Sequence, residues 1–287
     1  MPETVEIFEM APRDGLQNEK RLIPTAEKIA LVDMLSAAGF RRIEVASFVS
    51  PKWVPQMADS AEVLGGIARR PGVRYTALTP NMKGYEAARA ARADEVAIFA
   101  SASEGFSQAN LNCSISESLA RFEPIMEAAR ADNLQVRGYV SMVTDCPFDG
   151  PTPPGKVAEV AAKLREMGCY EVSLGDTVGR ATPESITAML RAVCDAVPAD
   201  ALAGHYHDTG GRALENIEAS LVQGIRVFDA AVGGLGGCPY APGAAGNVAT
   251  EAVAARLAAL GYETGLDAER LAAAGAFARK IREGADG

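Results

Sequence analysis

The chain has 287 residues, of which 48% are hydrophobic and 23% are charged, and its formal net charge is −9. This composition is ordinary for a globular protein and allows a sizeable core. The acidic balance provides no basic surface for nucleic acid or for an anionic membrane, and no apolar run reaches the roughly 18–20 residues of a membrane span. We therefore expect neither nucleic acid nor a membrane among its partners.

The five cysteines are widely spaced and include no CxxC pair; they are Cys113, Cys146, Cys169, Cys194 and Cys238. This pattern argues against a disulfide framework or a cysteine zinc site and fits a reducing cytosol. The first ten residues enter a strand-like alternation and lack the features of a signal or transit segment. We expect a cytoplasmic protein, and nothing in the sequence excludes a homodimer.

Strand-like and helix-like segments alternate along the whole chain. Short segments rich in β-branched residues predict eight strands, at 5–9, 42–47, 73–78, 95–100, 135–141, 171–174, 202–207 and 227–232. Apolar residues at three- and four-residue intervals predict helices between them, for example at 25–38, 115–131 and 156–167. Ser116 and Thr182 mark helix starts, and Gly168 marks a helix end.

Strands that alternate with helices form parallel βαβ units. Eight such units favour a closed barrel over an open sheet, so the predicted fold is a (β/α)₈ barrel. Two additional C-terminal helices are predicted at 250–260 and 267–283. No linker or low-complexity tract interrupts the pattern, and we expect one domain over residues 1–287.

The only two histidines, His205 and His207, end the seventh predicted strand. Residues two apart on a strand share a face, so both imidazoles are expected at the barrel mouth, where such enzymes carry their active sites. A hydrogen-bonded pair of core histidines is the alternative. Oxygen ligands from Asp14 and Asn247 favour a metal site, because two nitrogen and two oxygen donors suit a hexacoordinate Mg²⁺ or Mn²⁺, or else Zn²⁺.

Three further charged residues follow or lie in predicted strands. Arg13 offers a fork of donors to a developing oxyanion, and the alternative is a rim salt bridge with Asp14. Glu44 lies in an apolar strand, where a buried carboxylate needs a partner, and Arg13 is the obvious one. Asp176 is either a cap for the next helix or a residue of the active site.

The segment 233–247 is rich in glycine and lacks the Lys-Ser/Thr of a phosphate-binding loop. Its composition predicts irregular structure and a lid that closes over a substrate. Cys238 lies in this segment. It is either a passive small residue or a thiol that exchanges a proton above the metal.

Four sequence blocks are similar to one known family. They are APRDGLQNE at 11–19, ASFVSPKWVPQM at 46–57, GCYEVSLGDT at 168–177 and GLGGCPY at 234–240. Over nearly its whole length the chain resembles the DRE-TIM metallolyases and, among them, the 3-hydroxy-3-methylglutaryl-CoA lyases. The RDG and HxH elements are shared with related synthases and aldolases, whereas the PRDGLQNE, SFVSPKWVPQM and GLGGCPY sequences are more specific to the lyases.

The resemblance implies an activity and a set of site residues. The reaction would be metal-dependent cleavage of 3-hydroxy-3-methylglutaryl-CoA, an acyl-CoA, into acetyl-CoA and acetoacetate, as in leucine degradation. The implied metal ligands are Asp14, His205, His207 and Asn247. The implied catalytic residues are Arg13, Glu44, Asp176, His205 and Cys238. Among these, Arg13 would stabilise an enolate-like oxygen and Cys238 would be the catalytic thiol.

One departure keeps a second substrate open. Gly210 stands where relatives often have a larger residue, which would widen the pocket near the metal and suit a longer or differently branched 3-hydroxyacyl-CoA. A condensing synthase of the malate or homocitrate type and a non-catalytic barrel that holds a metal for stability are further alternatives. Without the leader and cysteine-bearing tail of the vertebrate enzymes, a bacterial cytoplasmic enzyme is the simpler expectation.

Overall fold

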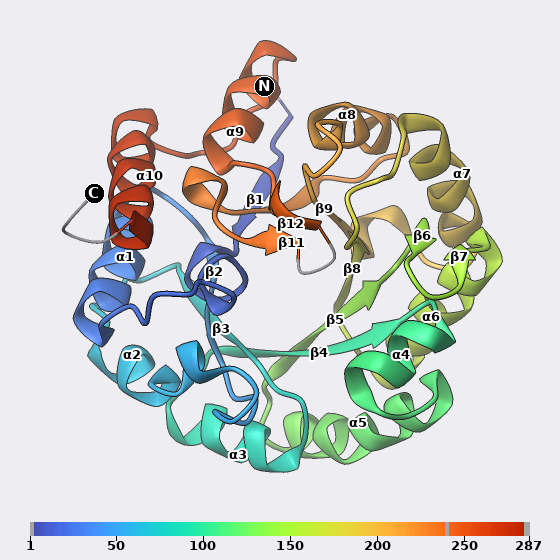
Figure 1. Ribbon diagram of the computed structural model, residues 1–287, viewed down its shortest axis with the longest axis horizontal. Coiled ribbons are helices and arrows are strands. Elements are labelled where there is room, and N and C mark those ends of the chain that lie inside the picture. The colour runs from blue at the N-terminus through green and yellow to red at the C-terminus, as the bar shows by residue number, and fades with distance from the viewer. Residues whose placement is uncertain (1–2, 239–240, 284–287) are drawn as a thin grey trace.

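The computed structural model describes residues 3–238 and 241–283, without the side chains of residues 237–238 and 241–245. Its centre is a closed barrel of eight parallel strands (Figure 1). In barrel order the strands are β1 (Glu6–Glu9), β10 (Val227–Ala230), β9 (Leu202–Tyr206), β8 (Glu171–Asp176), β5 (Gln135–Ser141), β4 (Glu95–Ser101), β3 (Arg74–Leu78) and β2 (Arg42–Ser47). Each of these strands has two parallel neighbours, so the barrel leaves no open edge.

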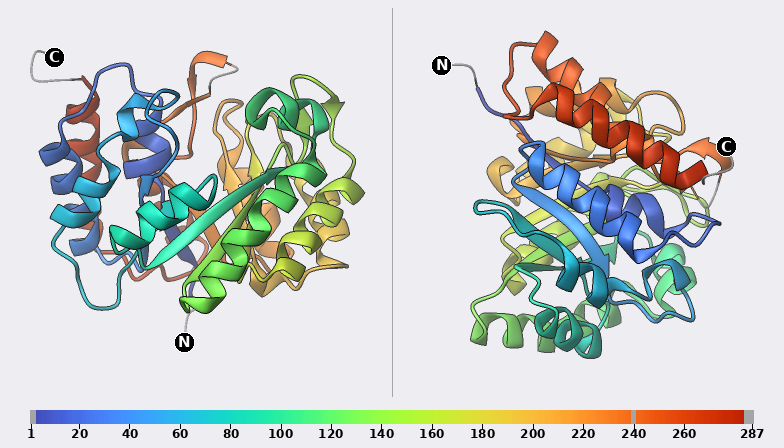
Figure 2. Two further views of the ribbon diagram at one scale, coloured as in Figure 1. Left: turned by 90° about the horizontal axis from the view of Figure 1, so that it is seen from below. Right: turned by 90° about the vertical axis from the view of Figure 1, so that its left-hand side faces the viewer.

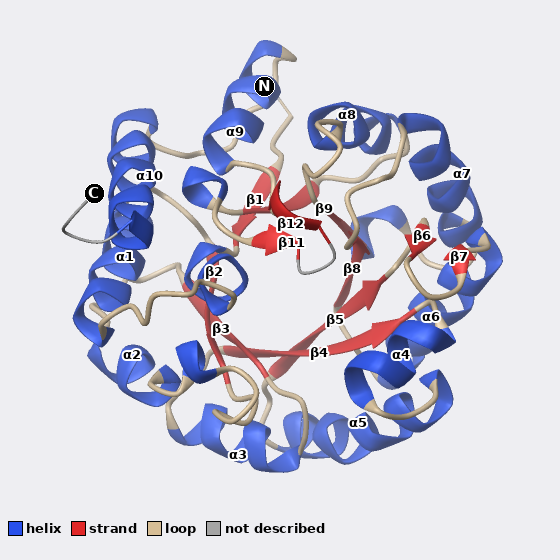
Figure 3. Cartoon of the chain, viewed as in Figure 1, coloured by secondary structure: helices blue, strands red, loops and turns tan. Residues whose placement is uncertain are grey.

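Helices surround the barrel on its outside (Figure 3). They are α1 (Thr25–Ala37), α2 (Ser60–Gly66), α3 (Met82–Ala90), α4 (Glu104–Leu111), α5 (Ile115–Ala131), α6 (Pro154–Met167), α7 (Pro183–Cys194), α8 (Ala213–Val222), α9 (Thr250–Ala259) and α10 (Ala268–Glu283). The last helix, α10, packs against α1 and closes the helical ring (Figure 2). In the described part of the chain, every helix is too short or too polar to span a membrane.

The predicted fold class is confirmed, and all eight strands are present within two residues of their predicted ends. Both predicted C-terminal helices are also present, as α9 and α10. The strand pattern was readable because these strands are covered on both sides, by helices outside and by other side chains inside the barrel. Every residue of β2 and of β8, for example, is buried.

Helix ends follow local capping chemistry. The predicted helix at 115–131 is confirmed as α5, but the entry signal assigned to Ser116 is wrong, because the cap is Ser114. The Ser114 hydroxyl accepts the Glu117 backbone N–H at 3.1 Å, and the Glu117 carboxylate accepts the Ser114 N–H at 2.8 Å. The other two predictions are confirmed: Thr182 caps α7, and Gly168 ends α6 with a φ of 111°.

The prediction that 233–247 has no regular structure is wrong. Two short strands, β11 (Gly237–Cys238) and β12 (Ala241–Ala245), pair antiparallel there and lie at the end of the barrel where the parallel strands finish (Figure 2). A second small hairpin, β6 (Asp145–Cys146) with β7 (Gly150–Pro151), was not predicted. Two-residue and glycine-rich strands carry too short an alternation of apolar and polar residues to be recognised in a sequence.

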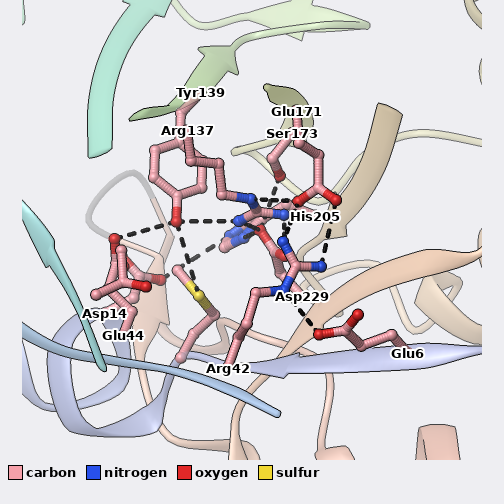
Figure 4. Close-up of polar contacts among 12 residues, drawn as sticks. Glu6, Asp14, Arg42, Glu44, Arg137, Tyr139, Glu171, Ser173, His205 and Asp229 are labelled. Carbon is pink, nitrogen blue, oxygen red and sulfur yellow. Dashed lines mark hydrogen bonds and ion pairs between the residues drawn. The ribbon is translucent and has the colours of Figure 1, made fainter. Parts of the chain in front are cut away.

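The interior of the barrel is charged (Figure 4). Arg42 Nη1 and Arg137 Nε both donate to Glu171 Oε1, at 2.8 and 2.7 Å. Arg137 also donates to both oxygens of Asp229, at 2.7 and 3.0 Å. These four side chains come from β2, β5, β8 and β10 and are at most 6% exposed. Because removing one partner of a buried ion pair costs about 3–5 kcal/mol, this network ties different sides of the barrel together.

Glu9, the last residue of β1, is a buried carboxylate held by three hydrogen bonds. Its Oε1 accepts the backbone N–H groups of Ala11 and Val232, at 2.9 and 3.0 Å. Its Oε2 accepts the Thr250 hydroxyl at 2.8 Å. The carboxylate thus joins the loop after β1 to both ends of the glycine-rich segment. Burial outweighs the three hydrogen bonds and raises the pKa of Glu9 to about 7.

We predict that Glu9→Gln stabilises the protein more at pH 8 than at pH 5. The pKa of Glu9 is about 7 in the folded protein against 4.5 ordinarily, so the stability that its proton contributes is complete below pH 4.5 and is lost as the pH rises through 7. A neutral amide removes this loss. The gain in the free energy of unfolding that the substitution causes should be larger at pH 8 than at pH 5 by on the order of 2–3 kcal/mol. Urea unfolding at both pH values measures it, and an equal effect at the two would contradict the prediction.

Candidate metal centre

The loop after β1 positions Arg13 and Asp14. It is a π-helical turn, Ala11–Gly15, and such turns are frequent at functional sites. Arg13 Nη1 donates to Asp14 Oδ1 at 2.6 Å, and the Gln17 amide donates to the same oxygen at 2.9 Å. Burial alone would raise the pKa of Asp14, but the charge of Arg13, helped by the two histidines and a hydrogen bond from Asn247, lowers it to about 2. Asp14 is therefore ionised at neutral pH.

Glu44 on β2 is fully buried and pairs with Arg13, as predicted. Arg13 Nε donates to Glu44 Oε2 at 2.5 Å, and Arg13 Nη2 contacts the same oxygen. The Tyr139 hydroxyl donates to Glu44 Oε1 at 3.0 Å. A guanidinium has five N–H donors, and the contacts with Glu44 and Asp14 use three of them. The two remaining N–H donors lie outside these contacts. The two carboxylates fix the plane of the guanidinium.

The structure brings His205, His207 and Asp14 together. One ligand atom of each residue lies within 4.8 Å of the others, with His205 Nε2 at 3.9 Å from Asp14 Oδ2. The two imidazole centroids are 5.3 Å apart. Burial, reinforced by the charge of His205, lowers the pKa of His207 to about 4. The imidazole of His207 is therefore neutral near pH 7, as a metal ligand must be.

His205 is oriented by Asp229, a residue absent from the sequence-based prediction (Figure 4). His205 Nδ1 lies 3.2 Å from Asp229 Oδ2, which also accepts the Ser173 hydroxyl at 2.7 Å. A carboxylate behind a histidine places the ring proton on Nδ1 and leaves Nε2 free to ligate. The sequence holds a signal for such residues: polar side chains two apart in apolar strands, as with Arg137 and Tyr139 on β5, mark the face inside the barrel.

Asn247 reaches the cluster from the glycine-rich segment. Its Nδ2 donates to Asp14 Oδ2 at 2.8 Å and to the Leu235 carbonyl at 3.3 Å, and its backbone forms an antiparallel bridge with His207. The atom that faces Asp14 is thus the amide nitrogen, so ligation through Oδ1 needs a half-turn of the amide. Gly236 has a φ of +105°, and a Cβ there would lie 2.7 Å from Asn247 Nδ2. Glycine is what lets this segment pack over the amide.

Asp176 ends β8, and its carboxylate organises the loop that follows. Its Oδ2 accepts the Ala181 N–H at 2.9 Å, and its Oδ1 accepts the Gly179 N–H and the Thr144 hydroxyl, both at 3.2 Å. These contacts are those of a residue that shapes a loop, while the cap of α7 is Thr182. A catalytic role for Asp176 stays a prediction.

Cys238 belongs to β11, where its backbone pairs with Ala241 of β12. Its side chain lies outside the described part of the structure, so its predicted role as the catalytic thiol is untested. The other four cysteines are free thiols, and Cys113, Cys146 and Cys169 are buried. Their burial agrees with the packing role expected of them.

The residues at the mouth fit a hard divalent cation. Arg13 faces two carboxylates, Asp14 and Glu44, which leaves a local formal charge of −1. The buried imidazole of His207 is neutral near pH 7, and one of its nitrogens lies within 4.8 Å of ligand atoms of Asp14 and His205, as a shared metal site requires. A carboxylate, two imidazoles and a nearby amide form a mixed oxygen and nitrogen donor set, which suits Mg²⁺ or Mn²⁺ when further positions are filled by water or substrate.

We predict that Asp229→Asn weakens metal binding by about 10–100-fold, because the carboxylate behind a ligating histidine sets its tautomer and direction. Titration calorimetry with Mn²⁺ measures the affinity, and the melting temperature shows whether the variant is folded. Ser173→Ala is the matched control. Its hydroxyl donates to the same Asp229 oxygen, but the variant keeps the carboxylate that contacts His205. Equal Mn²⁺ affinity in wild type and Asp229→Asn would refute the orienting role.

Comparison with known proteins places the chain in a family. The HMGL-like family model matches residues 4–277. The chain is 59% identical, over 96% of its own length and 92% of the relative's, to the 3-hydroxy-3-isohexenylglutaryl-CoA/hydroxy-methylglutaryl-CoA lyase of Pseudomonas aeruginosa. Its structure matches the HMG-CoA lyase of Brucella melitensis with a TM-score of 0.97 and 63% identity, covering 98% of this chain and 100% of that one. It also matches an HMG-CoA lyase from Acinetobacter baumannii, whose structure is a complex with coenzyme A and 3-methylmalate. That match has a TM-score of 0.92 and 36% identity, and it covers 98% of this chain and 92% of that one. The chain belongs to the HMGL-like family.

Proposed function

We propose that this chain is a divalent-metal-dependent carbon–carbon lyase that cleaves 3-hydroxy-3-methylglutaryl-CoA into acetyl-CoA and acetoacetate, a step of leucine degradation. The observation that carries the proposal is the grouping of Asp14, His205 and His207 beside Arg13 at the barrel mouth. The names of the relatives from Pseudomonas and Brucella support the reaction, and the coenzyme A complex of the Acinetobacter protein supports an acyl-CoA substrate. A cytoplasmic location and a homodimer remain part of this proposal.

The proposed ion is Mg²⁺ or Mn²⁺, with Asp14, His205, His207 and Asn247 as its ligands. When bound, such an ion lowers the pKa of a hydroxyl group that it coordinates. Near neutral pH, Asp14 contributes an ionised carboxylate and His207 contributes a neutral ring. Asp229 fixes the ring of His205 so that its Nε2 faces the proposed ion site.

Arg13 binds the oxygen on which negative charge develops. Breaking the bond between carbons two and three of the substrate leaves acetoacetate and the enolate of acetyl-CoA. The two Arg13 N–H donors outside the contacts with Asp14 and Glu44 are available to that enolate oxygen. Glu44 acts through Arg13, because its buried carboxylate fixes the guanidinium before the substrate arrives.

Two proton transfers complete the reaction. A base removes the proton of the tertiary hydroxyl, and Asp176 takes this role. His205 is the less suitable base, because Asp229 holds its Nδ1 proton and its Nε2 is the proposed ligand atom. Burial raises the pKa of Asp176, against the hydrogen bonds from Ala181 and Thr144, which makes it a better proton acceptor than an exposed carboxylate. Cys238 of the proposed catalytic loop, residues 233–247, then protonates the enolate. The segment would also exclude water when it covers the mouth.

A longer acyl branch is the second candidate substrate, because the name of the Pseudomonas relative includes an isohexenyl compound. Gly210 was the residue expected to make room for such a branch. It lies in a pocket lined by Gly179, Arg180, Thr209 and Arg212 as well. An apolar branch there would have to desolvate two arginines without giving them a partner, so this pocket does not favour such a branch. The shorter methyl compound therefore remains the preferred substrate.

We predict that the protein reconstituted with Mg²⁺ or Mn²⁺ releases acetoacetate from 3-hydroxy-3-methylglutaryl-CoA and stops after chelation. Comparison of kcat/KM with a longer-chain homologue separates the two substrates. Turnover of the longer compound alone would refute the proposed substrate, and full activity after chelation would refute the proposed metal dependence.

The same assay tests the thiol. Cys238→Ala should lower kcat by about 10²–10⁴-fold, the usual contribution of a general acid, with unchanged Mn²⁺ affinity. Cys113→Ala is the control, because Cys113 is a buried free thiol outside the proposed site. If Cys238→Ala keeps the wild-type kcat, Cys238 is not the proton donor.

A further inference from the structure

The pocket that contains Gly210 lies between the loops that follow β8 and β9. It has a volume of about 340 Å³ and is lined by Gly179, Arg180, Thr209, Gly210 and Arg212. Both loops begin next to the proposed site, since Gly179 is three residues beyond Asp176 and Gly210 is three residues beyond His207. A water molecule takes up about 30 Å³ in the liquid, so the pocket has room for a polyatomic ligand.

The floor of this pocket is built from closely packed backbone. Gly210 N–H donates to the Gly179 carbonyl at 2.9 Å. A Cβ at residue 210 would lie 2.8 Å from that carbonyl oxygen, and a Cβ at residue 179 would lie 2.6 Å from Thr209 Oγ1. Asp176 holds the Gly179 N–H at 3.2 Å. The two glycines therefore allow the two loops to pack closely against each other.

Two arginines line the pocket. Arg180 Nη1 forms a long ion pair, at 3.5 Å, with Asp145 Oδ2, and a guanidinium has five donors. Arg212 interacts electrostatically with Glu184, which is fully exposed to solvent. The carboxylate of Asp208 accepts the Ala213 N–H at 3.1 Å.

The amino end of a helix lies next to this pocket. Arg212 is the residue before α8, a ten-residue helix that begins at Ala213. The amino end of a helix favours an anion, and here the Asp208 carboxylate already accepts one of its N–H groups. In a chain with a net charge of −9, two arginines around one hollow at the catalytic end of the barrel favour an anionic ligand.

We propose that this pocket is an anion site that binds a phosphate group. Two planar guanidinium groups, one from each of the two loops, match the oxygens of a phosphate. The phosphate belongs either to the coenzyme A part of the substrate, in which case the site rests on the proposed function, or to free phosphate. An apolar acyl branch is disfavoured because it would have to desolvate both guanidinium groups without a partner.

The first experiment uses inorganic phosphate on the full chain without metal, at constant ionic strength. Titration calorimetry should show binding to wild-type protein that weakens at least tenfold in the double variant Arg180→Gln/Arg212→Gln, because a neutral amide cannot replace the charge-assisted hydrogen bonds from a guanidinium to a phosphate. Arg191→Gln is the matched control, since Arg191 lies in the last turn of α7 and outside the pocket. No binding to wild type, or equal binding to the double variant, would overturn the proposal.

The second experiment identifies the source of the phosphate and does not decide whether the site exists. If the site takes a phosphate of the substrate, phosphate inhibits competitively and the double variant raises KM several-fold with kcat unchanged. If the site takes free phosphate, KM is the same in both proteins and phosphate binding survives saturation with substrate. A protein that shows no lyase activity at all would refute the proposed function and leave the calorimetric result standing.

Discussion

The contact of Arg137 with Asp229, and of Asp229 with His205, links the barrel interior to the proposed metal site. Arg137 holds both oxygens of Asp229 inside the barrel, and one of these oxygens lies 3.2 Å from His205 Nδ1. Asp229 is on β10 and His205 on β9, so their contact depends on the closed order of the strands. A buried carboxylate without its guanidinium would be strongly destabilised. The same interaction therefore stabilises the fold and directs one proposed ligand of the metal.

The rest of the mouth is assembled around this fixed histidine by two buried acids. Glu44 holds Arg13 from β2, and Glu9 holds the backbone of the loop after β1 together with both ends of the glycine-rich segment. Gly236 then allows that segment to lie against the amide of Asn247. Residues more than 200 positions apart in sequence are in this way brought within hydrogen-bond distance of Asp14. The barrel supplies rigid strand ends, and the loops supply the polar groups of the site.

The strands and the family could be predicted from the sequence, because eight buried segments and four motif blocks are local patterns. The pairing of Arg13 with Glu44 was also predictable, since a buried carboxylate needs a cation. Asp229 could not be linked to His205 without knowing which strands are neighbours. The β11–β12 hairpin was missed because its residues are mostly small and give no alternation. The same limit applies to Asn247, whose motif indicated a ligand but not which amide atom faces Asp14.

The central claim is that Asp14, His205 and His207 hold one divalent cation. Electron spin echo spectroscopy of the protein with Mn²⁺ tests it directly, because nitrogen couplings appear only when imidazole rings are bound to the ion. We expect one Mn²⁺ per chain with nitrogen couplings from two imidazoles, and the loss of one of them in His207→Ala. Bound Mn²⁺ without any nitrogen coupling, or a spectrum unchanged in His207→Ala, would contradict this account of the site.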